Sequence, residues 1–230
     1  MAYVLVHGAW HGGWCWDAVA ESLAGDGVGV GAVELPSVGE DPNGDLYDDA
    51  AAVRAAIDAV DGPVVLVAHS YGGAPVTEGA AGAANVAHVV YVAAFMPDAG
   101  ESLLGMVGGH EPDWWITAPD GLTFTPADPT RLFYNDCAPE VAAAAAARLR
   151  PQNKVTSVQP LRHVAWREFP TTYVICERDQ ALPPAAQEAM SGRAGAVSRL
   201  DCGHSPFLAC PDDLVAIIRG VAIIRGVASA

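Results

Sequence analysis

The sequence predicts an α/β protein built on a doubly wound, mostly parallel sheet, and three observations support this. Short apolar runs rich in β-branched residues alternate with helix-length segments along the first 95 residues. The same alternation returns from about residue 169 onward. One apolar run, residues 64–67, leads within a few residues to a serine flanked by small side chains, a pattern typical of a sharp strand-to-helix turn.

Composition is that of a compact globular chain. Of 230 residues, 51% are hydrophobic and 17% charged, which suits one domain with a sizeable core. The net charge of −15 argues against nucleic acid as a partner, because phosphate contacts need clustered Lys and Arg. The N-terminus has neither a basic region nor a long apolar segment, so we expect no secretory signal, no membrane span and a cytoplasmic location.

The five cysteines are scattered and form no CxxC pair. This spacing predicts neither a disulfide framework nor a zinc site. The glycine-rich loop after the first apolar run lacks the Gly-Lys-Ser/Thr ending of a phosphate-binding loop. We therefore expect neither a metal site nor a bound nucleotide.

The first part of the chain predicts four parallel strands joined by three helices. The strands are expected at residues 3–6, 28–35, 64–67 and 86–95, and the helices at about 15–23, 45–60 and 71–84. After residue 168 the pattern resumes with strands at 171–176 and 196–200, and helices at 183–191 and from about 211. The hexapeptide of residues 215–220 is repeated at 221–226, which predicts either a longer last helix interrupted at Gly220 or a duplicated tail.

Residues 97–168 interrupt this rhythm with clusters of Pro, Trp, Asp and Gly and an Ala-rich helix at about 139–149. We interpret them as a small inserted lid, which leaves residues 1–96 and 169–230 as the core. Candidate lining residues of a substrate pocket are large and mostly aromatic: Trp10, Met106, Trp114, Trp115 and Phe133. Three further lid residues are candidates: Phe124, Leu132 and Tyr134. The alternative is that most of these side chains only fasten the lid to the core.

Ser70 is the candidate nucleophile. It lies in Ala68-His69-Ser70-Tyr71-Gly72, with small residues two places to either side. Such a turn brings strand and helix so close together that larger flanking side chains would clash. The turn would place Ser70 at the carboxyl end of the sheet and at the start of a helix, where the helix dipole favours negative charge.

A serine hydroxyl needs a base to accept its proton, and the base in turn needs an acid. His204 follows the last predicted strand, and Asp179 follows the strand before it, so both belong to the same end of the sheet. The order Ser, Asp, His suits this architecture. Asp98, after the fourth strand, is the rival acid. Two further carboxylates are expected to be solvated loop charges: Glu177 and Asp201.

The oxyanion of a tetrahedral intermediate needs two N–H donors. We expect the backbone N–H of Tyr71, directly after the nucleophile, and that of Ala9 in the loop after the first strand. His7 is expected to brace this loop, and its spacing to His11 on a glycine loop does not suggest a metal site. The other histidines are expected to be structural: His69, His88, His110 and His163. Cys137 is expected to pack inside the lid.

Taken together, these motifs resemble the α/β-hydrolase superfamily, and more narrowly its group of small esterases, hydroxynitrile lyases and plant methylesterases. The resemblance spans nearly the whole chain and lies in four segments: residues 5–14 (LVHGAWHGGW), 69–73 (HSYGG), 133–137 (FYNDC) and 203–207 (GHSPF). It implies a Ser70-His204-Asp179 triad, an oxyanion hole from Ala9 and Tyr71, no cofactor, a mostly helical lid and a homodimer in many members.

The sequence departs from the lyase branch of that group at two positions. Lysine-dependent lyases carry a Lys directly after the catalytic His and a Thr after the first-loop His, where this chain has Ser205 and Gly8. The other lyase type has an Asn at the position of Gly8. The sequence therefore predicts a serine carboxylesterase for small, largely apolar esters. The alternatives are a carbon–carbon lyase and a non-hydrolytic receptor for a small molecule.

Overall fold

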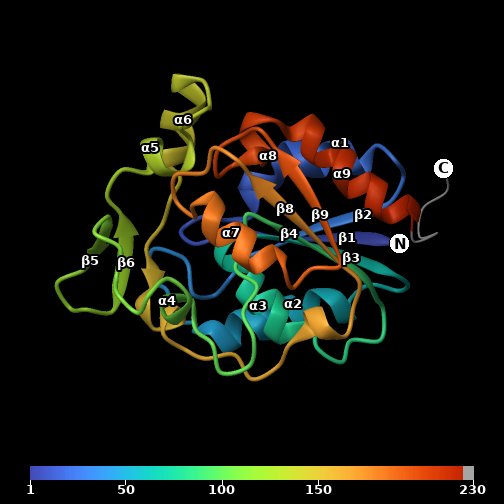
Figure 1. Cartoon of the computed structure of the whole chain (residues 1–230), viewed down its shortest axis with the longest axis horizontal. Coiled ribbons are helices and arrows are strands. Elements are labelled where there is room, and N and C mark those ends of the chain that lie inside the picture. Colours follow the sequence, from blue (N-terminus) through green and yellow to red (C-terminus); the bar gives the residue numbers. More distant parts are fainter. Residues whose placement is uncertain (225–230) are drawn as a thin grey trace.

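The computed structural model describes residues 1–224, and its centre is a six-stranded parallel sheet with strand order β2-β1-β3-β4-β8-β9. Figure 1 shows this sheet edge-on between two layers of helices. Its strands are β1 (Ala2–Val6), β2 (Gly29–Val33), β3 (Val64–His69), β4 (Val86–Val92), β8 (Thr171–Cys176) and β9 (Ala196–Leu200). All five pairings are parallel, as the alternation of strands and helices predicts.

The apolar runs form strands that are buried on both faces. Every residue of β3 is buried, and successive side chains point to opposite sides of the sheet. Val64 and Leu66 pack in the cluster beneath one face, while Val65 and Val67 pack in the cluster on the other. A continuous apolar run therefore serves two hydrophobic cores, one on each side of the central strand.

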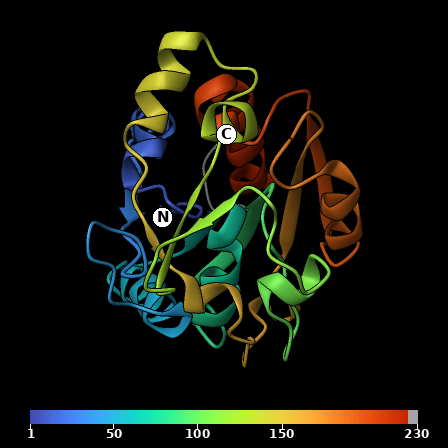
Figure 2. The ribbon, with the colours of Figure 1, turned by 90° about the vertical axis from the view of Figure 1, so that its left-hand side faces the viewer.

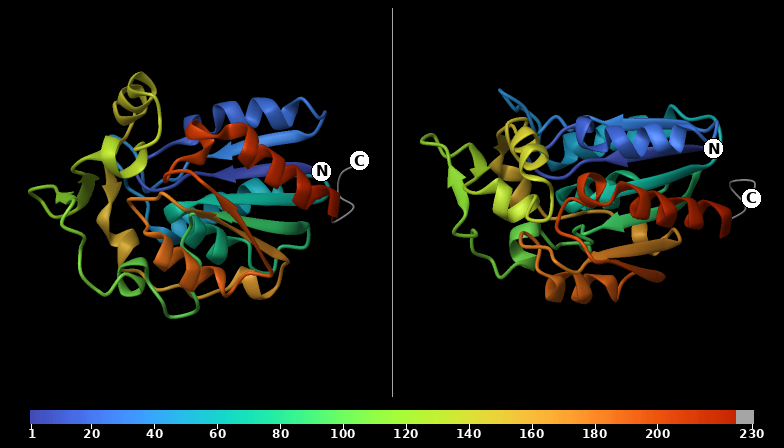
Figure 3. Two further views of the ribbon diagram at one scale, coloured as in Figure 1. Left: turned by 45° about the horizontal axis from the view of Figure 1, so that its top comes forward. Right: turned by 90° about the horizontal axis from the view of Figure 1, so that it is seen from above.

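Helices cover both faces of the sheet (Figure 1, Figure 3). One face carries α2 (Leu46–Asp58), α3 (Gly73–Gly79) and α7 (Pro184–Ser191). The other carries α1 (Asp17–Ala24), α8 (Pro206–Ala209) and α9 (Pro211–Ile224). Short 3₁₀ turns are η1 (Gly13–Trp16), η2 (Ser70–Gly72), η3 (Lys154–Ser157) and η4 (Ala165–Arg167). Together the helices and the sheet make the three layers of a doubly wound fold.

The segment between β4 and β8 contains both helices and strands. Its helices are α4 (Leu103–Met106), α5 (Pro129–Phe133) and α6 (Pro139–Ala146). Its strands β5 (Trp115–Thr117), β6 (Thr123–Pro126) and β7 (Gln152–Asn153) form a separate antiparallel sheet. The expectation of a mostly helical insert is therefore incomplete, because strands of two to four residues are too short to leave a periodic signal. Figure 2 shows these elements in front of one end of the large sheet.

Several predicted boundaries shift in the structure, among them the end of α3, which stops at Gly79 rather than near residue 84. β4 ends at Val92, three residues before the predicted end, because Ala93 adopts a positive φ of 41°. α9 continues through Gly220 to Ile224, so the repeated hexapeptide lengthens the last helix without an interruption at Gly220, and its final residues lie outside the described ones. Within residues 1–224 no helix combines the length and the apolar character needed to cross a bilayer.

Candidate active site

Ser70 lies in a tight turn between β3 and α3. Its φ of 50° is unusual for a residue with a side chain, and its carbonyl oxygen accepts a hydrogen bond from Phe95 N over 3.0 Å. A Cβ at Gly72 would lie 2.5 Å from the carbonyl oxygen of His7. The need for a small residue at Gly72 is thus confirmed, but the limiting neighbour is the chain leaving β1, and not β3 itself.

His204 follows β9 and lies against Asp179, which follows β8. His204 Nδ1 is 2.6 Å from Asp179 Oδ2, and both side chains are almost fully buried. An aspartate in this position holds the imidazole in one orientation and favours a proton on Nδ1, which leaves Nε2 to accept one. The structure thus brings together the histidine and the acid that the sequence predicts.

Asp179 is itself held by three further donors. Its Oδ1 accepts from the backbone N–H groups of Ala181 and Leu182, at 2.8 and 2.9 Å. Its Oδ2 accepts from Gln187 Nε2 at 2.9 Å. Sequence reasoning missed Gln187, whose only signal is a polar residue on the buried side of α7, three residues before the buried Met190.

The alternative acids lie elsewhere. Asp98 pairs with Arg167 at the surface. Glu177 lies 3.4 Å from Arg199, and Asp201 lies 3.0 Å from Arg178. Each of these carboxylates forms an ion pair with an arginine. Among the candidate acids, only Asp179 contacts His204.

The residue before Ser70 ties the loop of His204 to the turn. His69 Nε2 donates a hydrogen bond to the carbonyl oxygen of His204 over 2.8 Å. Burial lowers the pKa of His69 well below its usual value, so the ring stays neutral and this N–H remains a donor at neutral pH. His69 is therefore structural, as predicted, but its contact with the loop of His204 was not foreseen.

Gly203 allows a close approach between two loops. A Cβ at this position would overlap the side chain of Asn135 and lie 2.7 Å from Asp136 Oδ1. The N–H of Gly203 donates to Asp136 Oδ2 over 2.5 Å. The loop that carries His204 is thereby held against the loop between α5 and α6.

Ala9 is held by histidines on both sides. His7 Nδ1 donates to the carbonyl oxygen of Gly8 over 2.8 Å, which fixes the peptide group that contains the nitrogen of Ala9. His7 Nε2 accepts from Leu35 N over 3.2 Å, and burial lowers the pKa of His7. The predicted bracing role of His7 therefore has a concrete geometry, directed at the N–H that we expect in the oxyanion hole.

His11 fixes the next peptide group in the same way. Its Nδ1 donates to the carbonyl oxygen of Ala9 over 2.7 Å, and its Nε2 accepts from the hydroxyl of Tyr134 over 2.8 Å. Burial lowers the pKa of His11 to about 3, which keeps the ring neutral. Within residues 1–224 no group of three or more His, Cys, Asp or Glu side chains is arranged to hold a metal ion.

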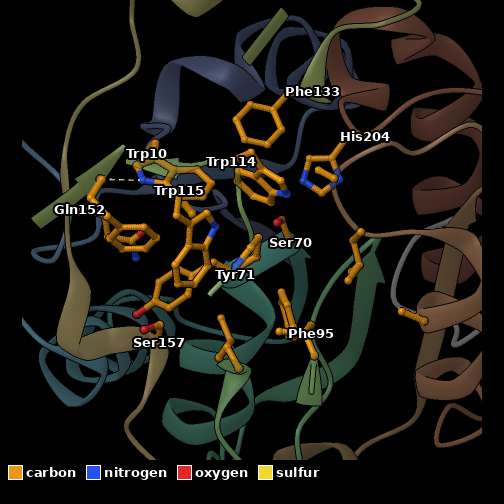
Figure 4. Close-up of a pocket in the computed structure, with 18 of the residues that line it drawn as sticks. Trp10, Ser70, Tyr71, Phe95, Trp114, Trp115, Phe133, Gln152, Ser157 and His204 are labelled. Atoms are coloured by element: carbon orange, nitrogen blue, oxygen red, sulfur yellow. Dashed lines mark hydrogen bonds between the residues drawn. The ribbon is translucent and has the colours of Figure 1, made fainter. Parts of the chain in front are cut away.

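A cavity of about 410 Å³ opens beside Ser70 and His204 (Figure 4). Ala9, Tyr71 and all five predicted pocket residues contribute to its wall: Trp10, Met106, Trp114, Trp115 and Phe133. Phe124 does so as well, whereas Leu132 and Tyr134 are buried behind the wall. Cys137 packs against the same aromatic cluster, and burial raises its pKa to about 11.

The chain matches the alpha/beta hydrolase family over residues 3–217. It is 32% identical to the alpha/beta hydrolase nvfD of Aspergillus novofumigatus over 96% of both chains. It is 29% identical to methylesterase 18 of Arabidopsis thaliana over 92% of this chain and 93% of the other.

Solved structures agree on the fold. A pyrethroid hydrolase from Sphingobium faniae superposes with a TM-score of 0.84 over 97% of both chains, at 24% identity. The turn after β3 holds Ser70 at positive φ, and the loops after β8 and β9 bring Asp179 and His204 together. With the match over residues 3–217, this shows that the chain belongs to the alpha/beta hydrolase family.

Proposed function

We propose that the protein is a serine carboxylesterase that hydrolyses small, largely apolar esters through an acyl-enzyme. That it hydrolyses carboxylic esters follows from the family and from the esterases among its relatives. The proposal adds the serine mechanism and the kind of substrate. The observation that carries it is the hydrogen bond between His204 and Asp179 beside a cavity that also contains Ser70.

In the proposed mechanism, Ser70 Oγ attacks the ester carbonyl carbon while His204 Nε2 takes the hydroxyl proton. The negative charge that forms on the carbonyl oxygen is stabilised by the N–H groups of Ala9 and Tyr71. Collapse of this intermediate breaks the bond to the alcohol, which leaves with the proton from His204. Water then attacks the acyl-enzyme with His204 as the base, and the acid is released.

The cavity wall supports an apolar substrate. Aromatic and aliphatic side chains dominate it, and no residue in the described lining is Asp, Glu, Lys or Arg. A charged acyl or alcohol group would lose its hydration there without gaining a partner. A neutral ester with an apolar body fits the site better.

Gly8 argues against the lyase alternative. A Cβ at this position would lie 2.8 Å from His69 Nδ1 and 2.9 Å from Ser70 Cβ. The Thr or Asn that lyases carry here would therefore displace the nucleophile or its neighbour. Ester hydrolysis needs no side chain at that position.

The test is hydrolysis of p-nitrophenyl butyrate by the native protein and by Ser70→Ala, with circular dichroism to check that the variant is folded. We expect the substitution to lower kcat by at least about 10³-fold. Mandelonitrile cleavage is measured in parallel. Undiminished ester hydrolysis by folded Ser70→Ala, or faster cleavage of mandelonitrile than of any ester, would overturn the proposal.

A further inference from the structure

The wall of the cavity contains a small polar patch, made of Gln152, Thr156 and Ser157. All three are buried, and Gln152 has no exposed surface. Figure 4 shows Gln152 and Ser157 on the side of the cavity away from His204. The mechanism above uses none of them.

The orientation of the Gln152 amide follows from its neighbours. Its nitrogen lies 3.3 Å from both Ser37 Oγ and Thr156 Oγ1. Ser37 donates its hydroxyl proton to Asp49, and Thr156 donates its proton to the carbonyl oxygen of Asn153. Both hydroxyl oxygens can therefore only accept from Gln152, so the group that faces them must be the NH₂.

This leaves the other atom of the amide, Oε1, as the free acceptor. It is buried and has no hydrogen-bond partner among the described residues. The backbone of Gln152 is fixed from two sides, since it pairs with Phe124 in β6 and bridges to Val38. A buried acceptor without a hydrogen-bond donor lowers the stability of the folded protein, unless a molecule bound in the cavity supplies the donor.

A second lining residue, Trp115, has a hydrogen-bond donor that lacks an acceptor within residues 1–224. The indole nitrogen of Trp115 is a buried donor that has no partner within the described chain. The described lining residues thus include a buried acceptor and a buried donor that have no partner, and none of these residues is Asp, Glu, Lys or Arg. A neutral hydroxyl or amide, which can donate and accept, suits such a lining better than an ammonium or a carboxylate does.

We propose that Gln152 is a specificity-determining residue, and that the substrates of this protein are neutral esters carrying a hydroxyl or amide N–H away from the scissile carbonyl. That group donates its hydrogen bond to Gln152 Oε1. The inference rests on the proposed esterase function and deepens it by naming the substituent that the cavity selects.

The experiment compares esters that differ only in this substituent. Methyl esters of phenylpropanoic acid are prepared with a hydroxyl or a methyl group at the ortho, meta or para position of the ring. These two substituents are similar in size, so the ratio of kcat/KM between the members of a pair reports the hydrogen bond. We expect the native protein to prefer the hydroxyl at one ring position by about tenfold.

The variants identify the residue responsible. Gln152→Leu and the longer Gln152→Met should bring the hydroxyl-to-methyl ratio down to about one or lower. Gln180 is a second glutamine of the same cavity wall, with an exposed side chain. Gln180→Leu is the matched control and should keep the ratio of the native protein.

Binding to Ser70→Ala, measured by isothermal titration calorimetry with the same ester pairs, separates this inference from the esterase function. If Ser70→Ala binds the hydroxyl ester more tightly than the methyl ester but the native protein hydrolyses neither, the Gln152 site is supported and the esterase function is overturned. Equal hydrolysis of both esters at every ring position would overturn the Gln152 site and leave the esterase. A preference that survives in folded Gln152→Met would also overturn it.

Discussion

His69 Nε2 donates a hydrogen bond to the carbonyl oxygen of His204, 2.8 Å away. The bond joins the residue before the proposed nucleophile to the backbone of the proposed base. It therefore links the turn after β3 to the loop after β9, two parts of the chain 135 residues apart. We expect the relative position of Ser70 and His204 to depend on this contact.

Loss of that bond should lower the rate and leave binding largely intact. His69→Phe keeps a planar ring but removes the donor, so the loop of His204 is free to move. We expect kcat to fall by about 10- to 100-fold with little change in KM, because a small misplacement of a catalytic group has effects of this size.

His69→Gln is the matched variant, because its amide can present an N–H donor in place of Nε2. It should recover most of the lost kcat on p-nitrophenyl butyrate. If the phenylalanine and glutamine variants both match the native enzyme, the bond does not position His204.

Gly8→Ala should impair catalysis without unfolding the protein. The added Cβ would lie 2.8 Å from His69 Nδ1 and 2.9 Å from Ser70 Cβ, so the loop that presents Ala9 N–H must shift. The loss of one oxyanion donor lowers kcat by about 10²–10³-fold, and we expect a fall of this order.

The control for this variant is Gly39→Ala, where a Cβ would meet nothing within 4 Å. Both proteins are assayed for kcat and for melting temperature. Gly8→Ala with native kcat, or with a loss no larger than that of Gly39→Ala, would contradict the role of this loop.

The main features of the fold are encoded locally, which is why they could be predicted. The apolar run of β3 predicts a strand because its alternate side chains face opposite sides of the sheet. The small residues around Ser70 predict the turn because they lie within a few residues of it. The loops after β8 and β9 follow from strand order, so Asp179 and His204 could be assigned to one end of the sheet before their contact was known.

The supporting contacts could not be predicted, because each joins residues that are distant in sequence or depends on fine geometry. Gln187 and Gln152 are ordinary polar residues until the structure places them against Asp179 and beside the cavity. The role of Gly203 depends on side chains 67 and 68 residues earlier, which no pattern around Gly203 indicates. Sequence periodicity reports burial, but not which polar partner a buried group finds.

Asp49 should make the folded protein less stable as the pH rises. It is a buried carboxylate that accepts from Tyr71 and Ser37, and burial raises its pKa to about 6 from the usual 3.8. A raised pKa means that the folded state holds the proton more tightly than the unfolded state does. The contribution of this group to stability is therefore full below about pH 4 and is lost by about pH 6, a change of about 3 kcal/mol.

Asp49→Asn removes this titration while keeping an oxygen for the N–H of Ser37. The free energy of unfolding of both proteins is measured in urea from about pH 4 to about pH 8. The difference, variant minus native, should rise with pH up to about pH 6 and then level off. Parallel pH profiles would contradict the raised pKa.

Asp179→Asn tests the acid and should act through the tautomer of His204. Oδ1 of Asp179 faces two backbone N–H groups, so the amide of an asparagine would keep its oxygen there and turn its NH₂ toward His204. The NH₂ would then donate to Nδ1, which moves the ring proton to Nε2 and removes the base that Ser70 needs. We expect kcat to fall by about 10³–10⁴-fold while KM changes little.

The control is Asp98→Asn, at the rival carboxylate that pairs with Arg167. It should retain kcat within about threefold, because an exposed ion pair contributes little. The opposite ranking of these two variants in steady-state hydrolysis of p-nitrophenyl butyrate would transfer the role of the acid to Asp98.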